Sequence, residues 1–161
     1  MSVLVPMRPE EFVKYRESSV TGYAKDNVEA GYWSAEGSLK RSRIIFDSLL
    51  PHGLTTPNNY LYEIKAAVDG ATVGFLWFAN VERQGIRMAY VYHILIKEPY
   101  RRLGHAKRAL FALEPIVASL GLSSIGLQVF GGNNIGAQAL YRQVGYVVTG
   151  INMSKNLNAS A

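Results

Sequence analysis

The sequence has no cysteine and only three histidines, His52, His93 and His105. Without thiols the chain can form no disulfide, no cysteine nucleophile and no thiolate metal site. The three histidines lie far apart in the sequence and lack the short spacing of metal ligands, so we expect no bound metal. The chemistry of the protein therefore depends on other side chains and on the backbone.

Long hydrophobic runs are missing as well. No stretch of about 20 apolar residues could cross a membrane, and the N-terminus does not resemble a signal peptide. Charged residues make up 18% of the chain and hydrophobic residues 48%, a balance typical of a folded domain. We expect one cytoplasmic domain that spans residues 1–161 and has no membrane partner.

Basic residues outnumber acidic residues by 17 to 12, which gives a net charge of +5. Such a balance can indicate a nucleic-acid partner. Here the excess is local, because residues 97–108 contain five basic residues and one acidic residue. A small molecule that carries phosphate explains a local excess as well as nucleic acid does, with no need of a long basic face.

The centre of that basic stretch is the run Arg101-Arg102-Leu103-Gly104-His105-Ala106. An apolar run precedes it and a helical pattern follows it, so the pattern predicts a strand, a turn and a helix. Free N–H groups at the start of the helix, its dipole and the close approach permitted by Gly104 suit a phosphate. Arg101, Arg102 and Lys107 add positive charge there. The alternative is an ordinary turn in which Gly104 serves packing and the cations are solvated.

Hydrophobic periodicity predicts the order of elements along the chain. We expect strands at residues 2–7, 61–68, 73–81, 87–96, 122–130 and 146–153. We expect helices at residues 9–31, 38–50, 106–120 and 135–143. Asp69-Gly70 favours a hairpin, so the three strands from residue 61 onward are expected to be antiparallel. Pro115 conflicts with an uninterrupted third helix, because an internal proline kinks a helix or restarts it.

With this order of elements, the C-terminal half resembles the GNAT superfamily of acyl-CoA-dependent N-acetyltransferases. The family's acetyl-CoA signature, Q/R-x-x-G-x-G/A, is met by Arg101, Gly104 and Ala106. A second signature is met by Asn134, Ala137, Leu140 and Tyr141, followed by Gly145-Tyr146. Residues 23–33 and 49–57 are similar to a group of small bacterial GNAT proteins that bring no settled substrate.

The resemblance implies an α/β (α+β) GNAT fold. Its mixed, mostly antiparallel sheet would have about six to seven strands, flanked by about four helices and splayed at the strand that ends near Ile96. The implied reaction moves the acetyl group of acetyl-CoA to a primary amine, which attacks the thioester directly without a metal. The acceptor would be a small-molecule or peptide amine, and a homodimer is possible. A non-catalytic acyl-CoA-binding domain is the alternative, followed by a nucleic-acid-binding protein.

The resemblance also implies which residues bind acetyl-CoA. Backbone N–H groups near Leu95 and Ile96 would donate to the tetrahedral oxyanion. The phosphates would lie on the loop and the first helical turn, at Arg101, Arg102, Leu103, Gly104, His105, Ala106 and Lys107. Asn134, with Ala137 on the following helix, would contact the pantetheine arm or order the loop, and asparagine is equally suited to cap a helix.

Two catalytic groups are needed, an acid for the CoA thiolate and a base for the amine. Tyr141 occupies the family's position for the acid, and the alternative is a core tyrosine. His93 lies on the long strand and has a suitable unperturbed pKa, near ~6.5. On a regular strand, however, His93 and Leu95 face one side while Tyr90 and Tyr92 face the other. Unless a bulge intervenes, either His93 is the base, or water held by the two tyrosines replaces it and His93 is a core histidine.

Overall fold

The computed structural model describes residues 3–129 and 135–157. Its strands are β1 (Leu4–Pro6), β2 (Asn59–Lys65), β3 (Thr72–Arg83), β4 (Ile86–Ile96) and β5 (Ile125–Leu127). Its α-helices are α1 (Pro9–Glu29), α2 (Ser38–Leu49), α3 (His105–Ser119) and α4 (Ile135–Gln143). Two short 3₁₀ helices are η1 (Gly53–Thr55) and η2 (Glu98–Tyr100). The prediction of four helices is confirmed.

The five strands form one mixed sheet in the order β1-β2-β3-β4-β5. Strands β1 to β4 are antiparallel neighbours, and β5 is parallel to β4. Gly70 and Gly85 adopt positive φ in the turns on either side of β3, which permits tight hairpins. The parallel β5 requires a longer crossover, which α3 supplies. The expected mixed sheet and its three successive antiparallel strands are confirmed.

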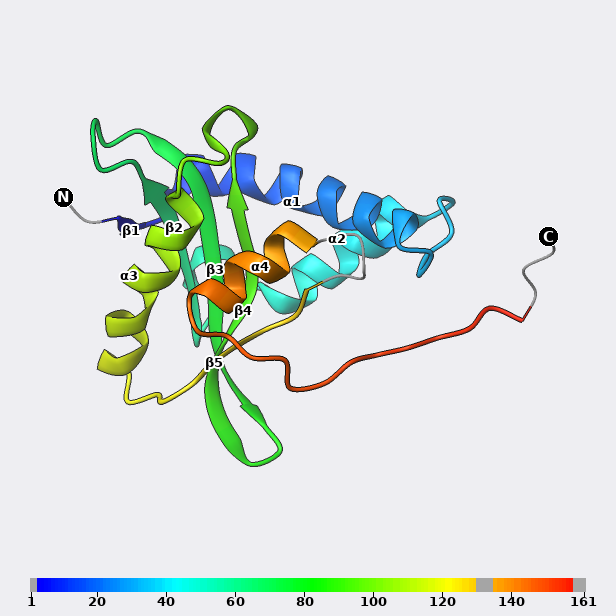
Figure 1. The fold of residues 1–161 in the computed structure, drawn as a ribbon. Coiled ribbons are helices and arrows are strands. Elements are labelled where there is room, and N and C mark those ends of the chain that lie inside the picture. Colours follow the sequence, from blue (N-terminus) through cyan, green and yellow to red (C-terminus); the bar gives the residue numbers. More distant parts are fainter. Residues whose placement is uncertain (1–2, 130–134, 158–161) are drawn as a thin grey trace.

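The sheet separates two hydrophobic layers. On one face, α1 and α2 pack against β2 and β3 through side chains that include Tyr15, Phe46 and Trp77. On the other face, α3 packs against the sheet through side chains that include Leu113 and Phe78. Figure 1 shows α1 and α2 behind the sheet and α3 and α4 in front of it. Side chains of β3 and β4 therefore enter one layer or the other according to their register.

The prediction of a last strand at residues 146–153 is wrong, and the described part of the chain has five strands instead of six to seven. The strand expected at residues 122–130 is reduced to β5, three residues long. A strand needs a hydrogen-bonding neighbour along its length, and β5 offers little edge to a further strand. Val147, Ile151 and Met153 are exposed, and Figure 1 shows this segment running out past α4.

Pro115 does not restart the third helix. α3 continues for four residues beyond it, to Ser119. The residue one turn earlier, Phe111, is 48% exposed. Water can therefore bind the carbonyl that loses its hydrogen bond to the missing proline N–H.

Candidate active site

Strand β4 has two neighbours over only part of its length. Its pairing with β5 ends at Val91, opposite Leu127, whereas its pairing with β3 continues to Ile96, opposite Gly74. Among the residues that the structure describes, no strand lies on the β5 side of residues 92–96. This is the splay expected near Ile96. It leaves backbone N–H and C=O groups available for hydrogen bonds to a ligand.

A β-bulge lies where β4 and β5 part. Trp77 is opposite His93, and the next pair of the ladder skips Tyr92, which is therefore an extra residue in β4. The ring of Tyr92 stacks on Trp77 at 4.7 Å between centroids, and His93 contacts Tyr15 of α1. Both side chains thus lie on the side of α1 and α2. Regular alternation would place only one of these two side chains on that face. Because of the bulge, both lie on it.

His93 is partly buried between the sheet and α1. Its Nδ1 atom lies 2.9 Å from the hydroxyl of Tyr15, which is fully buried. Burial disfavours the charged ring and lowers the pKa of His93 to about 4. The ring is therefore neutral at pH 7. A group with so low a pKa is a weak base for an alkyl amine, whose pKa is about 10.

The two tyrosines of β4 lie beside His93. The rings of Tyr90 and Tyr92 meet edge to face, with 5.1 Å between centroids, and Arg83 lies 4.1 Å from the centre of the Tyr90 ring. Burial, with a smaller contribution from Tyr90, raises the pKa of Tyr92. The Tyr92 hydroxyl therefore stays protonated at neutral pH and can both donate and accept a hydrogen bond.

The loop between β4 and α3 is rich in unpaired backbone donors. Arg102 and Gly104 both have left-handed conformations, with φ of 64° and 82°. Left-handed residues in a turn direct successive N–H groups into a concave anion-binding nest. The N–H groups of residues 102–107 have no acceptor within the described part of the chain. The positive end of the α3 dipole lies at the same place.

Arg108, which the sequence analysis missed, supports this loop from within α3. Its Nη2 atom donates to the carbonyl of Leu103 at 3.0 Å and to Nδ1 of His105 at 2.9 Å. Burial and the charge of Arg108 lower the pKa of His105, so this ring is also neutral at pH 7. A Cβ on Gly104 would lie 3.1 Å from Arg108 Nη1, and a positive φ is unfavourable for any residue with a side chain.

The three cations predicted to assist phosphate binding differ in their contacts. Arg101 donates through Nε to the carbonyl of Ile96 at 2.9 Å, so it links the loop to the end of β4. Arg102 and Lys107 are exposed, and neither forms an ion pair with another described residue. These two cations are the ones available to an anion in solution.

The second predicted part of the site lies on α4. Tyr141 and Ala137, one turn apart on this helix, are both partly buried, and burial raises the pKa of Tyr141. The Tyr141 ring lies 5.8 Å from that of Tyr146. No hydrogen bond or ring contact between described residues joins Tyr141 to His93. Asn134 lies outside the described residues.

A hollow of about 400 Å³ adjoins the end of β4 on the α1 side. Its apolar walls are Phe75 and Leu95, and its polar rim consists of Glu11, Lys14, Ser18, Lys97, Glu98 and Arg101. Half of these residues come from α1 and β3. Glu11, Lys14, Ser18 and Phe75 could not be assigned to the site from the sequence, because periodicity does not reveal which helix covers the end of which strand.

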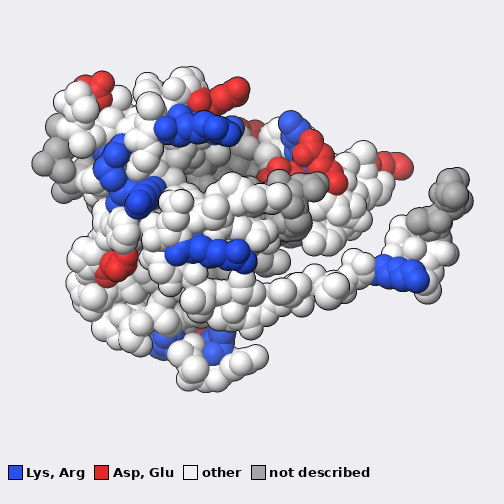
Figure 2. Space-filling model, viewed as in Figure 1, with Lys and Arg blue, Asp and Glu red and all other residues white. Residues whose placement is uncertain are grey.

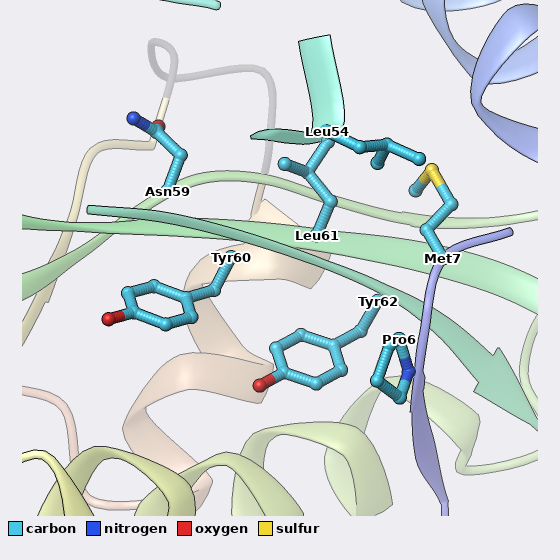
Figure 3. Close-up of a pocket in the computed structure, with 7 residues that line it drawn as sticks. All are labelled: Pro6, Met7, Leu54, Asn59, Tyr60, Leu61 and Tyr62. Carbon is cyan, nitrogen blue, oxygen red and sulfur yellow. The ribbon is translucent and has the colours of Figure 1, made fainter. Parts of the chain in front are cut away.

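Another hollow, of about 210 Å³, lies at the edge of β2. Figure 3 shows Tyr60 and Tyr62 on one side of this strand and Leu54, Leu61 and Met7 on the other. β3 separates this edge from β4. The hollow is therefore remote from the splayed strand and the loop.

A mixed sheet that splays beside a glycine loop at a helix N-terminus defines a class of proteins, the acyl-CoA-dependent acetyltransferases. Residues 23–146 match the model of the acetyltransferase (GNAT) family. The chain belongs to this family and is an acyltransferase. Residues 3–129 and 135–157 contain no group of three or more His, Cys, Asp or Glu side chains placed to hold a metal ion. None of their helices is long and apolar enough to cross a membrane.

Similar proteins include two from Bacillus subtilis (strain 168) that are described as uncharacterized N-acetyltransferases. YycN is 37% identical over 155 residues, which cover 96% of this chain and 98% of YycN. YdgE is 31% identical over 154 residues, which cover 96% and 97%. The crystal structure of YycN matches with a TM-score of 0.88 at 38% identity, over 96% of this chain and 97% of that one. AAC(6')-Iy, at 14% identity and a TM-score of 0.62 over 95% of both chains, shares the fold.

Proposed function

We propose that the protein transfers the acetyl group of acetyl-CoA to a primary amine, which attacks the thioester directly. Membership of the family supports acetyl transfer in general. The observation that carries the proposal is the position of the free edge of β4, at residues 92–96, directly before the loop whose N–H groups lack acceptors. One elongated molecule with a diphosphate and an amide-bearing arm fits both features.

The residues of the loop suit the phosphates of acetyl-CoA. The N–H groups of residues 102–107 bind the diphosphate, and the exposed Arg102 and Lys107 contribute charge. Gly104 leaves open the space that a side chain would fill. A related fold, AAC(6')-Iy, is known in complex with a bisubstrate analogue that contains CoA. When bound, acetyl-CoA supplies an acetyl group on a thiolate leaving group.

The end of β4 suits the other half of acetyl-CoA. The pantetheine arm pairs with the free backbone edge of β4, and N–H groups near Leu95 and Ile96 stabilise the oxyanion. Ala137 of α4 contacts the arm in this proposal; the same role, predicted for Asn134 from the sequence, falls outside the described residues. Arg101 holds the loop against this strand end through the carbonyl of Ile96, so the two halves of the site keep a fixed separation.

Proton transfer falls to tyrosines in this proposal. Water held by the hydroxyl of Tyr92 relays the proton of the amine to bulk solvent, and His93, with its lowered pKa, does not retain it. Tyr141, kept protonated by its raised pKa, gives a proton to the departing CoA thiolate. Tyr92 and Tyr141 are therefore the proposed catalytic residues, and His93 has the different role argued below.

The amine acceptor reaches β4 through the hollow of about 400 Å³ beside Leu95. This volume is in the range of small-molecule sites, which are about 300–1,000 Å³. On its rim, Glu11 is paired with Arg8 and Lys14, whereas Glu98 forms no ion pair with another described residue and is the carboxylate available to an ammonium group. Phe75 offers an apolar wall. These features favour a small amine with an apolar portion, or the end of a peptide.

Binding of nucleic acid is not part of the proposal. Figure 2 shows the Lys and Arg side chains of one face as separate patches with uncharged surface between them. A polyanion binds best to a continuous basic surface. The local cations at residues 101–108 suit a single phosphate-bearing molecule better.

The experiment that tests the proposal has two stages. Calorimetry or thermal shift with acetyl-CoA should show binding to the folded protein, and no binding at millimolar concentration would refute the proposal. A screen over amine classes, which measures release of the free CoA thiol, should then identify acceptors. Binding without transfer to any amine would favour a non-catalytic acyl-CoA-binding domain.

A further inference from the structure

Tyr15 and His93 form a hydrogen-bonded pair beneath the surface of the proposed site. The Tyr15 side chain is fully buried, with ring neighbours Phe75 at 5.3 Å and Phe46 at 6.3 Å between centroids. Its hydroxyl lies 2.9 Å from Nδ1 of His93, across the boundary between α1 and β4. A buried tyrosine hydroxyl needs a hydrogen-bond partner, and His93 lies within hydrogen-bond distance of it. The buried hydroxyl of Ser19, one turn further along α1, also interacts with Tyr15 and lowers its pKa.

Both groups of this hydrogen bond are neutral at pH 7. Burial raises the pKa of Tyr15, so its hydroxyl keeps its proton, and burial lowers the pKa of His93 to about 4, so its ring is neutral. A neutral imidazole has one N–H and one acceptor nitrogen. If the hydroxyl of Tyr15 donates to Nδ1, the proton of the ring lies on Nε2. If Nδ1–H donates to Tyr15 instead, the Tyr15 hydroxyl can donate to Ser19 Oγ, which has no other partner among the described residues, and Nε2 is an acceptor.

The Nε2 atom of His93 is not completely buried. It has no hydrogen-bond partner among the described residues. The one buried, unpaired side-chain N or O atom of these residues is Ser19 Oγ, so Nε2 of His93 is accessible to solvent. It belongs to the residue directly after Tyr92, on the segment of β4 that has lost its β5 neighbour.

We propose that Tyr15 is a positioning residue: its hydroxyl holds His93 as the Nε2–H tautomer, so that Nε2–H donates a hydrogen bond to an oxygen of the bound substrates. This inference rests on the proposed function, which places the substrates along the free edge of β4. The oxygen belongs either to the acetyl group of acetyl-CoA or to the amine acceptor. In either case His93 acts as a hydrogen-bond donor and takes no proton from the amine.

The tautomer can be measured on the full-length protein by ¹⁵N–¹H correlation spectra of the histidine rings at pH 7. His93 should show a protonated Nε2 and an unprotonated Nδ1, with the signal assigned by its loss in His93→Gln. Tyr15→Phe keeps the ring and removes the donor, so His93 should become a mixture of tautomers. His105 is an internal reference, because its Nδ1 accepts from the guanidinium of Arg108 and should stay unprotonated in both proteins.

Two spectroscopic results would overturn the inference: a protonated Nδ1 on His93 in the native protein, or an unchanged His93 spectrum in Tyr15→Phe. Tyr23→Phe, which alters a tyrosine that packs on Trp33 of the same helical region, serves as the matched control and should leave His93 unchanged. Thermal unfolding of each variant verifies that it folds.

Kinetics then identify the oxygen that His93 contacts. Loss of one hydrogen bond should lower kcat/KM of Tyr15→Phe about 2- to 10-fold. A weaker affinity for acetyl-CoA points to the acetyl oxygen, and a raised KM for the amine alone points to the acceptor. Equal kinetics of Tyr15→Phe and native protein would refute the donor role. If no amine is acetylated but the tautomer is as expected, the proposed function fails while the Tyr15–His93 arrangement stands.

Discussion

Tyr92 and His93 are consecutive residues of β4, yet their side chains lie on the same side of the sheet. Tyr92 stacks on Trp77 and His93 bonds to Tyr15, both of which belong to the layer beneath α1 and α2. The bulge that causes this lies where β5 ceases to pair with β4. A bulge bends a strand and increases its twist, so the same distortion aims two polar side chains at one site and opens the strand edge.

The hydroxyl of Tyr92 should therefore matter for catalysis and not for binding of acetyl-CoA. Tyr92→Phe keeps the stacking on Trp77 and removes the group that would hold water, so kcat/KM for the amine should fall about 10-fold or more. Steady-state kinetics and calorimetry with acetyl-CoA measure the two effects. Tyr62→Phe is the matched control, since Tyr62 stacks on Phe78 in the layer on the opposite face. Equal losses in both variants would contradict a role for Tyr92.

Tyr146 lies beside Tyr141 and serves as its matched control. The ring of Tyr141 lies 5.8 Å from that of Tyr146, and burial raises the pKa of both hydroxyls, to about 12 for Tyr146. If Tyr141 protonates the CoA thiolate, Tyr141→Phe should lower kcat about 100-fold or more, as loss of a general acid does. Tyr146→Phe should leave kcat within a few-fold of native. Full activity of Tyr141→Phe on an identified amine would exclude it as the acid.

Arg102 should contribute charge to phosphate binding while the backbone supplies most of the affinity. Arg102→Glu should weaken the binding of acetyl-CoA about 10-fold at low salt, and less at high salt because ions screen the exposed charge. Arg87→Glu makes the same charge change at the opposite end of β4, where Arg87 is exposed and bonds to Asn80. Calorimetry at two salt concentrations should show little effect there. Identical affinities for both variants would mean that the amides alone hold the phosphates.

The sequence predicted the loop and its neighbours well because their signals are local. Glycine at a helix start, the cations of residues 101–108 and the helical spacing after them all lie within one short segment. The register of β3 against β4 is different, since it depends on pairing between residues that are distant in the chain. Alternation therefore gave the wrong relation between Tyr92 and His93. The bulge became visible only once Trp77 was paired with His93.

The contact of Tyr15 and the structure of the segment after α4 could not be predicted, because each depends on a partner that is distant in the sequence. Tyr15 fits the apolar face of α1, but no pattern in the sequence reveals that its hydroxyl meets His93, 78 residues away. Residues 146–153 have the composition of a strand, yet a strand exists only where another strand pairs with it. In both cases the missing information is the partner, which a single sequence does not contain.

Gly74 should be essential for the shape of the end of β4. It lies opposite Ile96, and a Cβ there would collide with the carbonyl oxygen of Leu95 and come 3.1 Å from Cα of Ile96. Backbone atoms cannot turn aside as a flexible side chain can. Gly74→Ala should therefore lower the free energy of unfolding by about 1–3 kcal/mol. It should also weaken acetyl-CoA binding, because the strand end that carries the proposed oxyanion donors must shift.

The matched control for Gly74 is Gly22, which lies within α1 with open space around its Cβ position. Gly22→Ala should raise the free energy of unfolding by about 0.5–1 kcal/mol, because alanine is the better helix former. Chemical denaturation measures both variants. A Gly74→Ala protein as stable as the native one, with native affinity for acetyl-CoA, would contradict the close fit of β3 against β4.

The stability of the fold should depend on pH through His93. Its pKa in the folded protein, about 4, lies below its ordinary value of 6.5, so the fold favours the neutral ring. The contribution is complete above pH 6.5 and is lost as the pH falls toward 4. It is on the order of 3 kcal/mol, from 1.36 kcal/mol per pKa unit. Denaturation midpoints measured between pH 7 and pH 4 should decline accordingly.

The titration of Glu63 and His105 must be distinguished from the effect of His93 on stability. Burial alone would raise the pKa of Glu63, but hydrogen bonds from Arg8, Thr72 and Lys65 together lower it to about 2, so its contribution is lost between pH 4.5 and 2. Burial and the charge of Arg108 also lower the pKa of His105, but this ring lies at the surface loop. His93→Gln should therefore flatten the decline between pH 6.5 and 4 and leave the lower range unchanged, whereas His105→Gln should flatten it only slightly. A larger flattening in His105→Gln than in His93→Gln would show that burial does not hold down the pKa of His93. The neutral ring required for the Tyr15 hydrogen bond would then need another cause.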